Sequence, residues 1–259
     1  GWAPSRRIHR AHEVPLGDGS ARRWDVPDSC SWFRRQGWDG SRSVRGMEPA
    51  QSPDAVFSLI AAERRRLADA LEPLTPEEWA TPSLCDKWTC HQVAAHLNVP
   101  FRVGLLPFAV AMLKARGNFD VANDRIARDT ATKLDPAACI EGLRANAGHR
   151  FTPPGFGPEA PLTDVLAHGA DILQPVGRVP SAAPEALAVV LPFLVEGKGA
   201  GRFAGGRAQG LRFEATDQDL SAGSGDQVVR GPAYSLVGAL LGRSVFAADL
   251  EGEGADRLR

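Results

Sequence analysis

Capping residues followed directly by proline recur along this chain and mark the starts of short helices. The pairs are Ser52-Pro53, Thr75-Pro76 and Asp135-Pro136. A Ser, Thr or Asp side chain accepts a hydrogen bond from the first helical turn, and proline suits the first helical position because it lacks an N–H that would need a partner. Thr89 and Gln92 have the spacing of a capping box, in which each side chain bonds to the backbone N–H of the other residue. We therefore predict helices beginning at residues 53, 76 and 136. A further helix begins after Thr89 and continues toward Pro100, and we expect Pro100 and Pro107 to kink or divide it.

The hydrophobic period changes near residue 211. Helical spacing continues through "VANDRIARDTATKL" and through residues 184 to 196. The segment "LRFEAT" instead alternates apolar and polar residues, which predicts a half-buried strand. A second strand is expected at "DQVVRG", followed by a helix that begins at Pro232. The predicted fold class is α+β, mostly α.

The chain divides into three parts on these patterns. Residues 47–178 are predicted to form an all-helical domain, and residues 179–259 a smaller α+β domain. Residues 1–46 are rich in Arg, Gly, Ser and Trp and keep no helical or strand period. We expect this extension to be disordered or a spurious product of upstream translation, with a genuine flexible arm as the alternative.

Composition argues against several classes of partner. The net charge of −1 gives no reason to expect nucleic acid as a partner. No apolar run reaches the roughly 20 residues that a membrane-spanning helix needs, so no membrane partner is expected. The four cysteines contain no CxxC pair and no secretion signal is evident, which favours the reducing cytoplasm.

Three ionisable residues share one stripe of the predicted helix "TDVLAHGADI". Asp164, His168 and Asp171 stand at positions i, i+4 and i+7. The apolar residues of the segment lie on the opposite side of a helical wheel, so a solvated face is one interpretation. The other is a metal or catalytic site, because a carboxylate one turn before a histidine lets both reach one ion.

His96 lies on the packing face of its predicted helix, among Val93, Val99 and Val103. A buried imidazole needs partners for its nitrogens, and a core histidine bonded to the backbone would satisfy it. If His96 instead faces the stripe, then His96, Asp164 and His168 form a two-histidine, one-carboxylate set with open coordination positions. Zinc suits such a set, although the spacing also allows iron, nickel or manganese.

Four segments in one order resemble the mycothiol-dependent maleylpyruvate isomerase family, within the DinB-like metal-binding helical bundles. They are "ERRRLADALEPLTPEEWATPSLCDKWTCHQVAAHL", "FDVANDRIAR", "LTDVLAHGADILQPVG" and "LRFEATDQDL" with the later "GPAYSLVGALLGR". The resemblance covers residues 50 to 255. It implies a four-helix bundle that binds a divalent metal, usually zinc, followed by a small α/β domain similar to sterol-carrier folds.

The resemblance also implies roles for particular residues. The family's metal ligands fall on His96, Asp164 and His168, and its isomerase has Glu where this chain has Asp164. Asp171 would orient His168 or a bound group. Arg243, in "LLGR", is the candidate for binding a substrate carboxylate, and a cation that merely caps a helix end is the alternative.

The function implied is that of a metal-dependent enzyme that uses mycothiol, a low-molecular-weight thiol, on a small electrophilic substrate. The reaction would be isomerisation or S-transfer, with the metal favouring the thiolate. Two alternatives remain open at this point. One is a non-enzymatic protein that binds a small ligand, and the other is a metal-assisted hydrolase.

Overall fold

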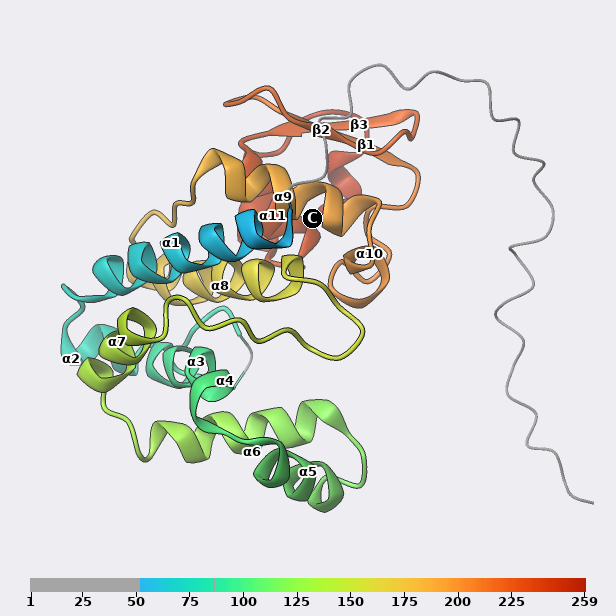
Figure 1. Cartoon of the computed structure of the whole chain (residues 1–259). Helices are drawn as coiled ribbons and strands as arrows, with labels where there is room; N and C mark the ends of the chain where they lie inside the picture. The colour runs from blue at the N-terminus through green and yellow to red at the C-terminus, as the bar shows by residue number, and fades with distance from the viewer. Residues whose placement is uncertain (1–51, 86) are drawn as a thin grey trace, which may run out of the picture. The chain divides into compact units, whose positions relative to one another are not determined.

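Helices make up most of the chain that the computed structural model describes, which is residues 52–85 and 87–259 (Figure 1). The α-helices are α1 (Pro53–Leu71), α2 (Pro76–Ala80), α3 (Cys90–Leu97), α4 (Val99–Arg102), α5 (Leu105–Lys114), α6 (Phe119–Ala131), α7 (Pro136–Ala145), α8 (Glu159–Leu173), α9 (Pro184–Val195), α10 (Gly199–Arg202) and α11 (Ala233–Leu240). Short 3-10 helices are η2 (Gln174–Val176), η3 (Ser244–Asp249) and η4 (Ala255–Leu258). The predicted extension over residues 1–46 lies outside the described residues.

The predicted helix starts are confirmed by their caps. The side chain of Ser52 accepts from the first turn of α1, and that of Asp135 accepts from the first turn of α7. Thr75 and Thr89 each form a complete capping box with the residue three positions later. These local hydrogen bonds fix where α1, α2, α3 and α7 begin.

The predicted division of the helix that begins after Thr89 is confirmed, and it falls just before Pro100: α3 ends at Leu97 and α4 begins at Val99. Proline has no N–H and its ring clashes with the carbonyl one turn earlier, so the helix ends before it. At the C-terminal end of the chain, Pro232 caps α11 instead of opening it.

Helices α1, α8, α3 and α7 pack in a ring in which each contacts the next, and α6 packs on the outside of α3 (Figure 1). The interior of the ring is apolar. Fully buried side chains there include Leu71, Val93, Leu143 and Ile172. Burying these side chains is the main favourable contribution to the packing.

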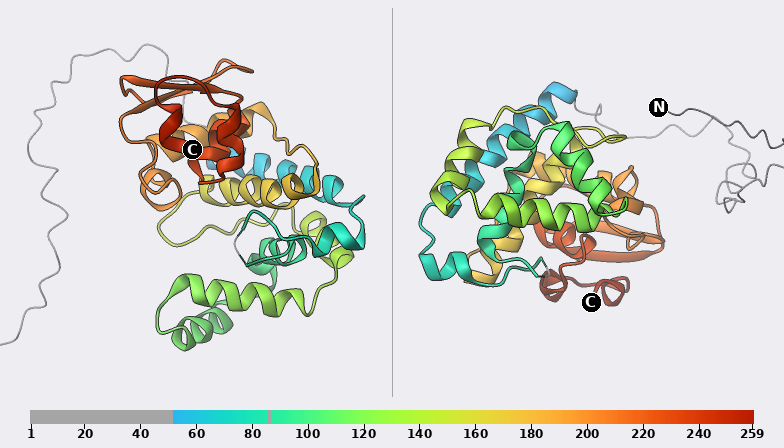
Figure 2. Two further views of the ribbon diagram at one scale, coloured as in Figure 1. Left: turned by 180° about the vertical axis from the view of Figure 1, so that it is seen from behind. Right: turned by 90° about the horizontal axis from the view of Figure 1, so that it is seen from below.

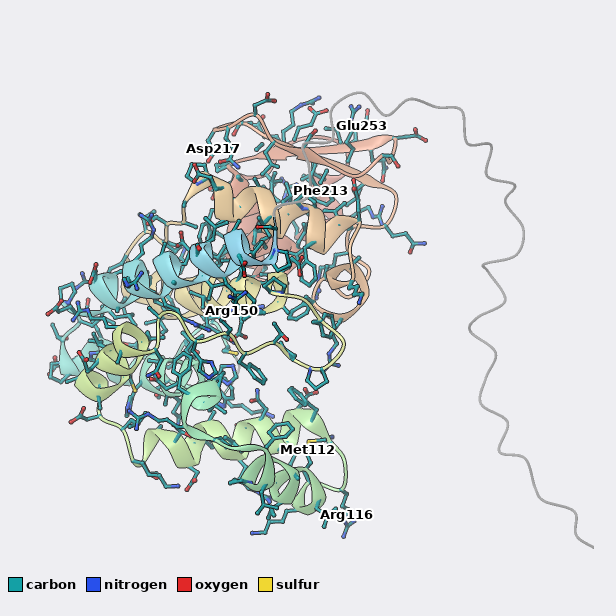
Figure 3. All side chains as sticks on the ribbon, viewed as in Figure 1. Met112, Arg116, Arg150, Phe213, Asp217 and Glu253 are labelled. Atoms are coloured by element: carbon teal, nitrogen blue, oxygen red, sulfur yellow. The ribbon has the colours of Figure 1, made fainter. Side chains whose placement is uncertain are left out.

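A three-stranded sheet lies between α10 and α11 in the chain (orange to red in Figure 2), and its strand order is β2-β1-β3. The strands are β1 (Leu211–Ala215), β2 (Ser221–Ala222) and β3 (Gln227–Gly231). β1 pairs antiparallel with β2 and parallel with β3, with Phe213 opposite Val229. Phe213 is fully buried between the sheet and the helices beside it (Figure 3). β1 and β3 confirm the predicted strands, whereas β2 was not predicted because two residues show no alternation.

Two apolar clusters meet along α1 and α8. One fills the ring of helices, and the other joins α9, α11 and the sheet to residues of the same two helices, such as Ile60 and Leu166. The described residues from Ser52 onward belong to one compact unit by their contacts. Since α1 and α8 supply both clusters, the boundary between residues 178 and 179 stays a prediction.

The chain is α+β and mostly α, as predicted. Within residues 52–85 and 87–259, no helix is both long and apolar enough to cross a membrane.

Candidate metal centre

The three ionisable residues of α8 lie along one stripe that runs from open to buried. The side chain of Asp164 is 37% exposed, that of His168 is 12% exposed, and that of Asp171 is fully buried. The expectation of a solvated face is therefore wrong for Asp171. α8 contacts α1, α3 and α9, and the end of its polar stripe at Asp171 is covered by neighbouring elements.

His96 faces this stripe from the last turn of α3. The Nε2 atom of His96 lies 3.7 Å from Oδ1 of Asp164, and the Nε2 atom of His168 lies 3.4 Å from the same oxygen. The two imidazole rings are 4.8 Å apart, edge to face. One possible ligand atom from each of the three residues lies within 4.8 Å of the others. The structure thus brings His96, Asp164 and His168 together.

The spacing of these atoms fits a small divalent cation. Ligand atoms of tetrahedral zinc, each about 2.0–2.1 Å from the ion, lie about 3.3 Å from one another. The contacts of 3.4 and 3.7 Å to Asp164 are close to that value. Two imidazoles and one carboxylate also leave a coordination position open, as catalytic zinc sites do. The donor set therefore suits a divalent metal.

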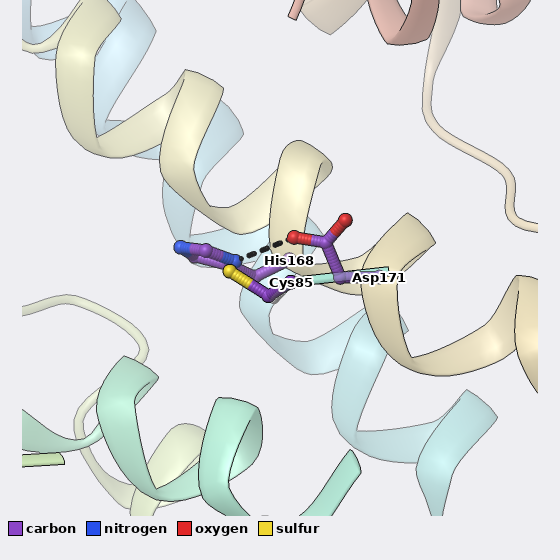
Figure 4. A group of neighbouring side chains, drawn as sticks. All are labelled: Cys85, His168 and Asp171. Atoms are coloured by element: carbon purple, nitrogen blue, oxygen red, sulfur yellow. Dashed lines mark hydrogen bonds and ion pairs between the residues drawn. The ribbon is translucent and has the colours of Figure 1, made fainter. Parts of the chain in front are cut away.

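Asp171 and Arg243 hold His168 from the side away from Asp164. The Nδ1 atom of His168 lies 2.9 Å from Oδ2 of Asp171, drawn as a dashed line in Figure 4. Arg243 donates from Nε to Oδ1 of Asp171 at 2.9 Å and from Nη2 to Oδ2 at 2.7 Å. A proton on Nδ1 donated to Asp171 leaves the lone pair on Nε2, which is the nitrogen that faces Asp164.

The charges of the centre stabilise one another. Burial alone would raise the pKa of Asp164, but the charges of His168 and His96 hold it far below its ordinary value. Burial alone would lower the pKa of His168, but the charge of Asp164 and the contacts to Asp164 and Asp171 raise it to about 9. The pKa of Asp171 is held low, against its burial, by the hydrogen bonds from Arg243 and His168.

The loop before α3 adds two residues that the sequence analysis did not place in the site. Cys85 lies beside His168 and Asp171, with one possible ligand atom from each within 4.8 Å of the others (Figure 4). The ring of Trp88 lies 5.2 Å from that of His96, and its Nε1 donates to Asp124 of α6 at 2.7 Å. In the sequence Trp88 is adjacent to the Thr89 capping box, which gives no sign that it contacts His96. The packing of the folded chain brings the two rings together.

Cys90 and His91 turn away from this cluster. Cys90 is fully buried, with its Sγ 3.5 Å from the carbonyl of Ile172. His91 Nε2 contacts the carbonyl of Leu134 at 2.7 Å. The carboxylate of Asp124 accepts hydrogen bonds from the side chains of Trp88 and Arg128, so it joins α6 to the loop before α3.

Residues 60–188 match the family model described as the mycothiol maleylpyruvate isomerase N-terminal domain. These residues belong to that family. Among curated proteins no sequence matches this chain.

Solved structures of the mycothiol-dependent maleylpyruvate isomerase are similar to the chain. One crystal structure is 16% identical, covers 79% of this chain and 94% of its own, and superposes with a TM-score of 0.51. A crystal structure of a mutant of that enzyme is 17% identical, with the same coverage and a TM-score of 0.49. At this identity the likeness to the first structure shows that the two proteins share a fold.

Proposed function

We propose that this protein is a divalent-metal-dependent, mycothiol-using isomerase or S-transferase, with the metal held by His96, Asp164 and His168. The observation that carries the proposal is the convergence of both Nε2 atoms on one carboxylate oxygen, at 3.4 and 3.7 Å. Membership of residues 60–188 in the mycothiol maleylpyruvate isomerase family supports the choice of thiol cofactor. A small electrophilic substrate and a cytoplasmic location belong to the same proposal.

The reaction follows from nucleophilic thiol chemistry. When bound, a divalent cation, which we propose to be zinc, favours the thiolate form of the cofactor thiol, and the thiolate is the nucleophile. Such a thiolate would supply one of two chemistries: isomerisation, through reversible addition to an activated double bond, or S-transfer, through displacement of a leaving group.

The residues of the chain prepare the centre for this chemistry. Asp171 accepts the Nδ1–H of His168, so that the proton a metal would displace from the charged imidazole is the one on Nε2, the nitrogen that faces Asp164. Arg243 balances the charge of the fully buried Asp171 with two hydrogen bonds. Because these bonds use its Nε and Nη2 donors, and Nη1 donates to the carbonyl of Leu241, we propose that Arg243 acts as a positioning residue through Asp171.

Metal content of the purified protein tests the ligand set. The wild type should contain one zinc per chain by elemental analysis, and His168→Ala should contain essentially none. His149→Ala is the matched control, because His149 is an exposed histidine that lies outside the set of His96, Asp164 and His168. Full zinc content in the His168→Ala variant would refute the assignment.

The dependence of turnover on the thiol tests the reaction class. Activity on an electrophilic substrate should require added mycothiol and should be absent with the metal-loaded protein alone. Hydrolytic turnover that persists without any low-molecular-weight thiol would instead identify a metal-assisted hydrolase.

A further inference from the structure

A buried cation on α1 has no counter-ion among the described residues. Arg64 is only 3% exposed. Its Nη1 donates to the backbone carbonyls of Ala147 at 2.9 Å and His149 at 2.8 Å, near the end of α7. In residues 52–85 and 87–259, no carboxylate lies within ion-pair distance of this guanidinium.

Part of the hydrogen-bonding capacity of Arg64 is unused. A guanidinium has five N–H donors, of which Nη1 supplies two. The buried Nε of Arg64 has no hydrogen-bond partner, and Nη2 donates to no residue of the described chain. A buried donor without an acceptor is costly, so Nε, the one unused donor of Arg64 that is buried, is the group that an added acceptor would satisfy.

Arg64 lies at the level of the metal centre. Helices α1 and α8 run side by side in the same direction (Figure 1). Leu67 is the neighbour of Gly169, since a Cβ added to that glycine would lie 3.4 Å from Leu67 Cδ1. Arg64 stands one turn before Leu67, and Asp164 stands little more than one turn before Gly169.

The guanidinium also contacts the short helix that follows His96. The ring of Phe101, five residues after His96 and in the helix that follows it, lies 4.9 Å from the Cζ atom of Arg64. Burial lowers the pKa of Arg64 to about 10, and the charge of Asp164 opposes this lowering.

Arg243, the other arginine near the centre, has a partner for its charge. Its charge is balanced by Asp171, and Nε, Nη1 and Nη2 all donate to protein acceptors. Of the two arginines, Arg64 is the one with both an unmatched charge and unused donors.

We propose that Arg64 binds a carboxylate of the substrate beside the metal centre. The planar guanidinium can offer Nε and Nη2 to the two oxygens of one carboxylate, which is the bidentate geometry that distinguishes arginine from lysine. The inference rests on the proposed function for the position of the reacting group, but anion binding by Arg64 is measurable without catalysis.

The test measures binding of maleate, a small dicarboxylate, in the absence of any thiol so that no addition occurs. Isothermal titration calorimetry compares zinc-loaded wild type with Arg64→Gln and Arg64→Lys. Arg65→Gln is the matched control, because Arg65 is the exposed neighbour on the same helix. We expect Arg64→Gln to weaken maleate binding on the order of tenfold or more, Arg64→Lys to weaken it less, and Arg65→Gln to leave it unchanged. Equal affinity in a folded, zinc-containing Arg64→Gln protein would overturn the proposal.

A second measurement uses the wild-type protein and does not depend on the folding of a variant. The Nε–H signal of Arg64, observed by nitrogen-15 NMR, should shift as maleate is added to the zinc-loaded and to the chelator-treated protein. An unchanged signal at saturating maleate would also overturn the proposal.

The two hypotheses fail separately. If the purified protein binds no zinc but its Arg64 signal still shifts with maleate, the proposed function is refuted and the anion site is supported. If the protein binds stoichiometric zinc but its Arg64 signal does not shift with maleate, only the anion site is refuted.

Discussion

Removal of the Arg243 side chain should destabilise the protein strongly, because it leaves the fully buried Asp171 with His168 as its one remaining charged partner among the described residues. Asp171 is fully buried, and Arg243, 19% exposed, gives it two charge-assisted hydrogen bonds. Breaking a buried ion pair by removing one partner costs about 3–5 kcal/mol. For a folded unit of this size, that loss corresponds to a fall in Tm on the order of 10 °C.

Chemical denaturation of the chelator-treated protein measures this effect without a contribution from metal binding. The variants are Arg243→Met, Asp171→Asn and the double variant, so that the coupling between the two side chains is obtained from a double-mutant cycle. We expect a coupling energy of about 1.5 kcal/mol or more, because in the double variant neither charge is left unpaired. Arg230→Met serves as the control, since the pair of Arg230 with Glu214 is exposed and should contribute less than about 1 kcal/mol. If Arg243→Met and Arg230→Met cost the same, or if the coupling is below about 0.5 kcal/mol, the reasoning is wrong.

Two further predictions concern protons and packing. Since the pKa of His168 is raised to about 9 in the folded protein, its charged form stabilises the metal-free protein below pH 6.5, and this stabilisation is lost as the pH rises through 9. Zinc must displace that proton, so the apparent affinity for zinc should rise up to about tenfold per pH unit below pH 9, and an affinity independent of pH would contradict the assignment. Gly142→Ala should destabilise the protein by about 1–3 kcal/mol in thermal unfolding, because the new Cβ would lie 1.9 Å from Oδ1 of the buried Asn98. Gly148→Ala, whose Cβ would meet nothing within 4 Å, should be nearly neutral, and a similar loss in both variants would exclude the contact as the cause.

The sequence was sufficient where the deciding interaction is local. Ser52, Thr75, Thr89 and Asp135 bond within the first turn of their own helices, so the starts of four helices could be read directly. The alternation in β1 likewise predicted a strand. The strand β2 was missed because it is defined only by its pairing with β1.

The candidate site was predictable in part for the same reason. Helical spacing alone places Asp164, His168 and Asp171 on one stripe, because they belong to one rigid element. The hydrophobic pattern of that helix assigned the stripe to solvent, and this was wrong for Asp171. Its burial depends on Arg243, which is 72 residues away in the chain.

By itself, then, the sequence determined the helix starts, the change from helix to strand and the residue types of the proposed ligand set. Only the tertiary structure brought His96 to within 3.7 Å of Asp164, buried Asp171 against Arg243, and left Arg64 with unused donors. The physical reason is the distance along the chain over which the deciding interactions act. Caps and periodicity act over one or two turns, whereas the burial of a charge and the meeting of two imidazoles are set by how distant helices pack.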